Sequence, residues 1–474
     1  MKKFTQLCAV IAIIIFLIPQ PVMSSSMPMT EETVNTDEIT INSSFGLDAG
    51  NTLLGPKKII DNARAAIVFE TGSQTLMYAW NADDKLYPAS FVKLMTGLIA
   101  VEEGNLADVV TVSDSAVSSL PVDAISADLL AGETMPLQDL LYCLLVSSAN
   151  DAAIAIAEHI AESQDQFVNM MNSRAQELGC LGTTFKNVHG LHDSEQLTTA
   201  RDVAKILDTA LQNESFRKIF TTSQHSVAAT NKTGERLLLS SNSLLDSASK
   251  LYYDERVLGG RTGVAQDGRR CIASLAEKNG MSLICVVMGS DTVYQEDGYS
   301  AITVGGYKET TALLDAGFEG NKYAQILHGN QALRQCVVEN GDSDLIVGPN
   351  ESVSAILPEA ATAENLTFHY VDRILKAPIA AGEKVSVVQV WYENICVVQA
   401  DLYAMNSVNT VDSLQVDQNE DPKSFEAGTA LLIVVIILLV AFGVFITVRM
   451  LPRLRFWARK IRNKRYRRNR RRSR

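Results

Sequence analysis

Residues 427–448 are apolar or small throughout and carry no charged side chain. At a rise of about 1.5 Å per residue, a helix of this length spans about 33 Å, which is enough to cross a bilayer. A helix of similar length in a soluble core would show a polar face, and this stretch has none. The sequence therefore predicts a transmembrane helix over residues 427–448, with the remaining chain divided between its two sides.

The residues that follow this helix are strongly basic. Residues 449–474 contain fourteen Lys or Arg and no acidic residue, so the positive-inside rule places this tail in the cytoplasm and the body outside. The net charge of the whole chain is −12, so without the +14 of the tail the remainder carries −26. So acidic a body argues against nucleic-acid binding, and the tail is expected to bind anionic lipid.

The N-terminus also indicates export. Residues 1–26 contain two lysines at the start, the apolar run Leu7–Ile18 and small serines at the end, which is typical of a signal peptide. The apolar run is short for a membrane span, and an uncleaved anchor is the alternative. Six cysteines follow this segment without any zinc-binding spacing. An exported protein could pair them, but the sequence does not say which.

The body divides by composition into two folded parts with linkers. We assign residues 27–55 to a polar linker, 56–320 to a large first domain, 324–408 to a small β-rich domain and 409–426 to an acidic linker before the membrane helix. In the first domain, hairpins are expected at Ala65–Trp80 and, around an Asn-Gly turn, at Cys271–Met288. Apolar periodicity predicts helices between and after these hairpins, over residues 90–102, 137–160, 164–178, 199–211 and 304–316.

This order of elements predicts an α+β fold, in which an antiparallel sheet carries a block of helices. Short β-rich runs follow in the second domain, at residues 332–339, 367–370, 384–392 and 395–400. The second domain is therefore expected to be all-β.

Three short motifs stand in chain order in the first domain. Ser90 and Lys93 lie three residues apart at the start of an apolar helix, where backbone N–H groups are free and the helix dipole is positive. That spacing puts both side chains on one helix face, so the amine can reach the hydroxyl. Ser148-Ala149-Asn150 is expected on a second helical segment, and Arg261-Thr262-Gly263 at the opening of a strand.

Similar short matches recur elsewhere and are set aside by their surroundings. Ser215 and Ser247 also precede a lysine by three residues, and Lys232-Thr233-Gly234 repeats the third motif with a lysine. These copies lie in polar stretches, and the Lys232 copy is read as an exposed turn. The Arg261 motif instead follows Val257–Gly260 and leads into an apolar hairpin, so it is preferred.

The three motifs together resemble the SxxK, SxN and KTG set of penicillin-binding proteins and serine β-lactamases. The segments Tyr87–Thr96, Leu145–Ala153, Asn187–Leu191 and Leu375–Ile379 extend the resemblance, over about residues 60–405, to the D-alanyl-D-alanine carboxypeptidases. The resemblance implies a β-lactamase/DD-peptidase-like catalytic domain that removes the terminal D-alanine of peptidoglycan stem peptides. It also implies covalent inhibition by β-lactams and no metal or other cofactor.

The resemblance gives each motif residue a role in acyl transfer. Ser90 attacks the carbonyl between the two D-alanines, and Lys93 takes its proton after burial and a nearby cation have lowered its pKa. Ser148 relays a proton to the leaving amine. Asn150 holds Lys93 and the substrate backbone.

The third motif is expected to bind the substrate. Arg261 and Thr262 bind its terminal carboxylate, with Gly263 beside them, and the backbone N–H groups of Ser90 and Val264 form the oxyanion hole. Two positions depart from the family pattern: Arg261 replaces the usual lysine, and Ala265 replaces a usual threonine. An arginine keeps the charge and can bind a carboxylate with two hydrogen bonds, but it cannot give up a proton.

Two other functions share part of this pattern. A β-lactamase of the common class also needs a glutamate in an ExxLN-like loop, and Glu235–Leu239 comes nearest without the asparagine. A wall-binding protein that has lost turnover is favoured only by Arg261 and Ala265. His189, Arg201 and Asp202 are expected to serve structure rather than catalysis.

Overall fold

The structure is a computed structural model that describes residues 52–411, apart from residues 56, 295–300 and 372. The predicted signal peptide, the membrane helix, the basic tail and nearly all of both linkers lie outside these residues. Among the helices that the structure does describe, none is both long and apolar enough to cross a membrane.

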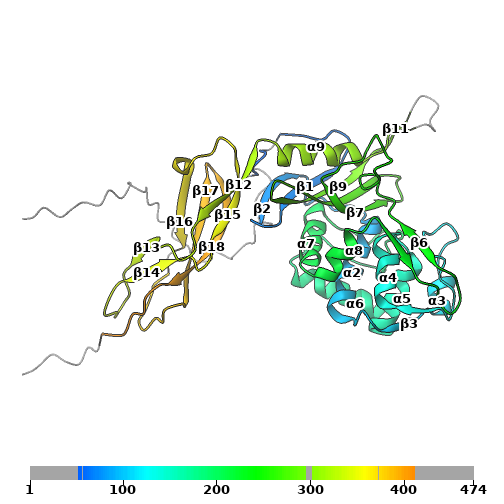
Figure 1. The fold of residues 1–474 in the computed structure, drawn as a ribbon, viewed down its shortest axis with the longest axis horizontal. Helices are drawn as coiled ribbons and strands as arrows, with labels where there is room; N and C mark the ends of the chain where they lie inside the picture. Colours follow the sequence, from blue (N-terminus) through cyan, green and yellow to red (C-terminus); the bar gives the residue numbers. More distant parts are fainter. Residues whose placement is uncertain (1–51, 56, 295–300, 372, 412–474) are drawn as a thin grey trace, which may run out of the picture. The chain divides into compact units, whose positions relative to one another are not determined.

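A five-stranded antiparallel sheet forms the centre of the first domain (Figure 1). Its strands, in spatial order, are β2 (Thr75–Trp80), β1 (Ala65–Glu70), β9 (Met281–Ser290), β8 (Arg270–Lys278) and β7 (Val257–Val264). The two predicted hairpins are both present. The β8–β9 turn runs through Asn279 and Gly280 at φ 53° and 80°, the left-handed values that Asn-Gly turns adopt.

Both faces of this sheet are buried, which explains why its strands read as continuous apolar runs. Ala65, Ile67 and Phe69 of β1 pack into the helical block, whereas Ala66 and Val68 pack against α9 (Tyr307–Phe318) on the opposite face. Successive side chains of a strand point to opposite faces, so one strand contributes to both layers. Helix α9 begins three residues later than predicted, after Gly306 at φ 90°.

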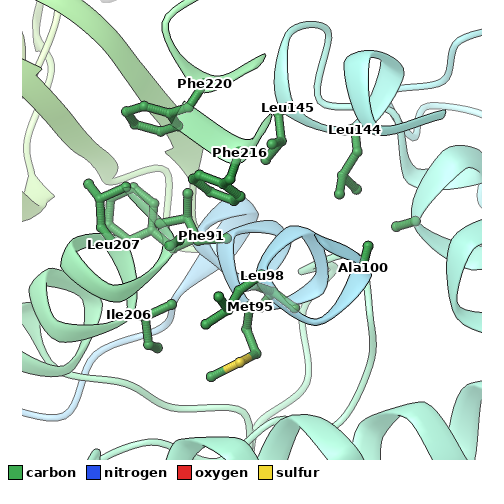
Figure 2. Packing of buried hydrophobic residues seen from close by; sticks show 14 of the residues in the cluster. Phe91, Met95, Leu98, Ala100, Leu144, Leu145, Ile206, Leu207, Phe216 and Phe220 are labelled. Carbon is green, nitrogen blue, oxygen red and sulfur yellow. The ribbon is translucent and has the colours of Figure 1, made fainter. Parts of the chain in front are cut away.

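The helical block surrounds one buried helix. Helix α2 (Val92–Glu103) follows a short 3-10 turn, η2 (Ala89–Phe91), and every residue from Val92 to Ala100 is buried. Figure 2 shows Met95 and Leu98 of this helix among side chains from its neighbours. These neighbours are α4 (Leu137–Leu145), α5 (Asn150–Ala161), α6 (Gln164–Glu177), α7 (Ala200–Leu211) and α8 (Glu214–Phe220).

Two predictions about the first domain were wrong in detail, and three of its elements were not predicted. The helix expected over residues 137–160 is two helices, because Ser148 adopts φ 67° in the connection between α4 and α5. A non-glycine residue in that conformation ends a right-handed helix. The Arg261 motif occupies the second half of β7 and does not open it. Helix α8 and the hairpin of β5 (Gln224–Val227) and β6 (Arg236–Leu239) were not predicted.

Smaller elements complete the first domain. Thr199 is the N-cap of α7, and its side chain accepts a hydrogen bond from the backbone N–H of Asp202. Asp202 in turn accepts from Thr183, and Arg201 forms an ion pair with Asp83, so both residues serve structure as expected. The remaining elements are β3 (Val109–Thr111), α3 (Asp114–Ser118), β4 (Thr134–Pro136), β10 (Val293–Tyr294) and β11 (Ala301–Thr303).

The second domain is built of β-strands, as predicted. A five-stranded antiparallel sheet has the order β13 (Arg334–Cys336), β14 (Leu345–Gly348), β18 (Ile395–Ala404), β17 (Lys384–Tyr392) and β16 (Leu366–Val371). A second pair joins β12 (Asn321–Leu327) to β15 (Val353–Pro358), and a 3-10 turn covers Ala363–Asn365. Only Arg334–Cys336 of the predicted strand 332–339 belongs to β13. No disulfide joins the six described cysteines, from Cys143 to Cys396.

Candidate active site

Ser90 lies in the turn η2 immediately before α2. Its hydroxyl does not cap the helix, because the N-cap position of α2 is Phe91 and no side chain caps there. The hydroxyl instead accepts a hydrogen bond from Ser148 at 3.3 Å. Ala89, the preceding residue, has φ 46°, an unfavourable value for an alanine that recurs at functional sites in proteins.

Two glycines allow other chain segments to approach this strained turn. A Cβ atom at Gly190 would lie 2.0 Å from the carbonyl oxygen of Ala89, and Gly190 itself has φ 90°. A Cβ atom at Gly263 would lie 2.9 Å from the backbone nitrogen of Ser90. Glycine is therefore required at both positions, and the Arg261 motif lies directly against the nucleophile turn.

Lys93 is completely buried beside this turn, with 1% of its surface exposed. Its Nζ donates to Oδ1 of Asn150 at 2.7 Å and to the backbone carbonyl of His189. Burial holds the pKa of the Lys93 amine well below its usual range, the positive charge of Arg261 lowers it further, and Asp151 partly offsets both. An amine in this environment loses its proton much more readily than a lysine in water.

The second motif closes the site from the helical block. The left-handed conformation of Ser148 turns its hydroxyl to Ser90, and Asn150 begins α5 with its side chain on Lys93. The contact predicted between Asn150 and Lys93 is confirmed. A direct hydrogen bond between Lys93 and Ser90 is absent from this site, all of whose residues the structure describes; the Ser90 hydroxyl is linked to Ser148 instead.

Arg261 is the second buried basic side chain of the site, with 3% of its surface exposed. Its Nη1 donates to the carbonyl of Leu145 at 2.5 Å, but Nε and Nη2 have no hydrogen-bond partner among the described residues. Burial lowers its pKa to about 10, so the guanidinium stays charged at neutral pH. Two unsatisfied donors on a buried cation can bind an anionic group such as a carboxylate.

The remaining residues of the third motif line the edge of β7. Thr262 lies 3.3 Å from the hydroxyl of Ser241, Oγ to Oγ, and Val264 is 53% exposed beside the nucleophile turn. The alternative motif at Lys232 lies elsewhere, in the exposed β5–β6 connection, where Thr233 bonds Glu133 at 3.1 Å. Ser215 and Lys218 lie on α8, and Ser247 and Lys250 in a later loop.

His189 contributes its backbone and does not act through its ring. Its carbonyl binds Lys93, and its Nδ1 accepts from the backbone N–H of Leu191 at 3.2 Å. Burial lowers its pKa to about 4, with a smaller effect of the charge on Lys93, so the ring is neutral at pH 7. Motif reasoning did not find this carbonyl, Gly190 or Ser241, because backbone contacts and hydroxyl pairs leave little signal in a single sequence.

Comparisons with known proteins identify the family to which this active site and fold belong. The sequence profile of the family described as D-alanyl-D-alanine carboxypeptidase matches residues 55–292, and that of the penicillin-binding protein 5 C-terminal domain matches residues 322–410. The chain belongs to the D-alanyl-D-alanine carboxypeptidase family. Its members are serine peptidases. The mixed fold followed by a C-terminal β domain is that of solved penicillin-binding protein structures.

Individual carboxypeptidases are similar along most of their length. The D-alanyl-D-alanine carboxypeptidase DacF of Bacillus subtilis is 29% identical over 294 residues, which are 61% of this chain and 70% of that protein. DacA of Haemophilus influenzae is 28% identical over 382 residues, or 77% and 90% of the two chains.

Solved structures of penicillin-binding proteins share the fold. Penicillin-binding protein 5 of Haemophilus influenzae has a TM-score of 0.62 and 27% identity, and the match covers 74% of this chain and 99% of that one. The peptidoglycan synthesis regulatory factor PBP3 of Streptococcus pneumoniae has a TM-score of 0.59 at 23% identity, with 74% and 100% covered. The second likeness concerns the fold alone.

Proposed function

We propose that this carboxypeptidase removes the terminal D-alanine from peptidoglycan stem pentapeptides through an acyl-enzyme on Ser90. The observation that carries the proposal is the pairing of two buried basic side chains around one serine. One is an amine with a lowered pKa, and the other is a guanidinium with two unsatisfied donors. The first can act as a base at neutral pH, and the second can hold a C-terminal carboxylate.

The acylation step begins at Ser90. Neutral Lys93 accepts the hydroxyl proton as Oγ attacks the carbonyl between the two D-alanines. The hydrogen bond between Ser148 and Ser90 supplies a route by which a proton reaches the leaving amine. Asn150 fixes the position of Lys93 through its 2.7 Å hydrogen bond. Water then attacks the ester, which releases the shortened peptide and restores Ser90.

Substrate binding is assigned to the third motif. Arg261 and Thr262 bind the terminal carboxylate, and the missing side chain of Gly263 lets the strand lie against Ser90. The backbone N–H groups of Ser90 and Val264 bind the oxyanion, where loss of one donor typically slows a reaction about 10²–10³-fold. A β-lactam imitates the acylated dipeptide and is expected to stop at the Ser90 ester.

We further propose that the enzyme acts outside the cell on a membrane anchor. This rests on the signal peptide at residues 1–26, the apolar stretch 427–448 and the basic tail 449–474. The body would then face the wall, where its substrate lies.

The experiment that tests the activity is release of D-alanine from a synthetic stem pentapeptide by purified protein, with Ser90→Ala as the control. The proposal expects release by the wild type alone. Wild-type protein that binds penicillin at Ser90 but releases no D-alanine would show a binding protein without turnover, and would contradict the proposal.

A further inference from the structure

The active-site strand offers an open edge to a peptide. Strand β7 is the last strand of its sheet and pairs only with β8 among the described strands. An extended peptide can add to such an edge as a further strand. With its carboxylate on Arg261 and its reactive carbonyl at Ser90 beside Gly263, the peptide would continue past Val264. At about 3.3 Å per residue, the residue before the two D-alanines would lie near Ala265.

A cavity opens at this place. It has a volume of about 160 Å³, and Tyr87, Leu197 and Ala265 are among the residues that line it. Tyr87 is three residues before Ser90, so the cavity continues the active site beyond the end of β7. At about 30 Å³ for each water, the volume holds roughly five waters. Its aromatic and aliphatic walls suit an aliphatic chain.

The charged residues of this cavity favour an anion. Arg64, Lys85 and Arg269 line it together with one acid, Asp267. Arg269 is already compensated by ion pairs with Asp267 at 2.7 Å and with Asp291 at 3.0 Å.

The other two cations are less fully compensated, because Arg64 acts on Asp267 only through its charge and not through an ion pair or hydrogen bond. Among the described residues, no hydrogen bond or ion pair is made by the guanidinium of Arg64 or the ammonium of Lys85. The side chain of Arg64 lies against Gly289, where a Cβ atom would approach it to 3.1 Å. Three positive charges and one negative charge thus line the cavity, which gives it a net positive charge in a protein whose own net charge is −12.

We propose that this cavity binds the side chain of the residue that precedes the two D-alanines, and that it selects an aliphatic side chain ending in a carboxylate. The inference rests on the proposed function, because the direction of the peptide along β7 follows from a carboxylate on Arg261. Arg64 and Lys85 bind the distal carboxylate, and Tyr87 and Leu197 contact the aliphatic part. Asp267 is placed to accept from an ammonium group on the same side chain.

Three peptides that differ only at the residue before D-alanyl-D-alanine separate the effect of the distal negative charge from the effect of the side chain's shape. They carry L-lysine, meso-diaminopimelate, and diaminopimelate with its distal carboxylate amidated. The full-length protein in detergent should hydrolyse the diaminopimelate peptide with a kcat/KM about fivefold or more above that of the amidated peptide. The amidated peptide keeps the shape and loses only the negative charge, so it is the sharper comparison.

The double variant Arg64→Gln, Lys85→Gln should lower this preference to less than about twofold, mainly through a lower kcat/KM for the diaminopimelate peptide. Lys218→Gln removes a lysine from α8, outside the cavity, and should keep the full preference. Equal kcat/KM for the diaminopimelate and amidated peptides in the wild type, or a preference that survives the double variant, would overturn the inference. If the wild type cleaved none of the three, the proposed function would fail instead. Binding of the three peptides by calorimetry would then decide the cavity's selectivity.

Discussion

Replacing Arg261 by alanine tests the substrate-binding part of the mechanism. The guanidinium is charged, buried and left with two donors that no described residue satisfies. Removing a charge-assisted contact of this kind commonly costs about 2–5 kcal/mol, which corresponds to a loss of about 30- to 5,000-fold in kcat/KM. The assay is D-alanine release from a pentapeptide, with circular dichroism to show that the variant is folded.

The same substitution changes the pH dependence, and the sign can be worked out. Arg261 lowers the pKa of Lys93, so its removal raises that pKa towards the usual value. Only neutral Lys93 accepts a proton, so activity rises with pH through its pKa. The acid side of the rate profile should therefore move to higher pH in Arg261→Ala. In Arg261→Lys the charge is kept, so the profile should move little and activity should be retained or increased.

Lys232→Ala is the matched control, because it alters the alternative motif in an exposed connection. It should leave both kcat/KM and the pH profile nearly unchanged. An inert Arg261→Ala together with a severe loss in Lys232→Ala would refute the assignment of the active-site strand.

Other predictions follow from individual contacts. Gly190→Ala should reduce penicillin labelling at least tenfold, because its Cβ would lie 2.0 Å from the Ala89 carbonyl; Gly280→Ala, equally left-handed but without a neighbour within 4 Å, should label normally. Burial lowers the pKa of His189 to about 4, so between about pH 6.5 and 4 the unfolded chain binds a proton at this residue and the folded chain does not. The free energy of unfolding should therefore fall by about 3 kcal/mol over this range. Urea unfolding of His189→Gln should lack that part of the pH dependence. If the unfolding free energies of variant and wild type depended on pH in the same way, this prediction would be contradicted. Leu98→Ala should lower the free energy of unfolding by about 2–5 kcal/mol, and the exposed Leu237→Ala by less than about 0.5 kcal/mol. Protease added to intact protoplasts should remove the body, whereas cleavage only after permeabilisation would reverse the proposed topology.

Much of the fold could be read from the sequence because its strands and helices are strongly periodic. The predicted hairpin of β1 and β2 has the expected bounds, and α6 ends one residue before the predicted helix. The break between α4 and α5 could not be read, because Cys143 to Ala153 is helical in pattern throughout. A single left-handed residue, Ser148, divides it. That conformation is imposed by packing around the site and not by local preference.

The active site, like the fold, was predictable from the sequence only in part. Motif order was enough to bring Ser90, Lys93, Ser148, Asn150 and Arg261 together. The choice of Arg261 over Lys232 depended on the apolar residues around each motif, and the structure places the Arg261 motif against Ser90. The carbonyl of His189, the role of Gly190 and the pair formed by Ser241 and Thr262 depend on the backbone path, which no residue pattern in one sequence specifies.

The formation of an ester on Ser90 is the central claim, and mass spectrometry measures it most directly. Full-length protein treated with benzylpenicillin should gain the mass of one penicilloyl group, and peptide mapping should place it on Ser90. Ser90→Ala should gain none, and Lys93→Met, which removes the base without adding a polar group, should react far more slowly. An adduct on Ser148, Ser215 or Ser247, or undiminished labelling of Ser90→Ala, would contradict the assignment of the nucleophile.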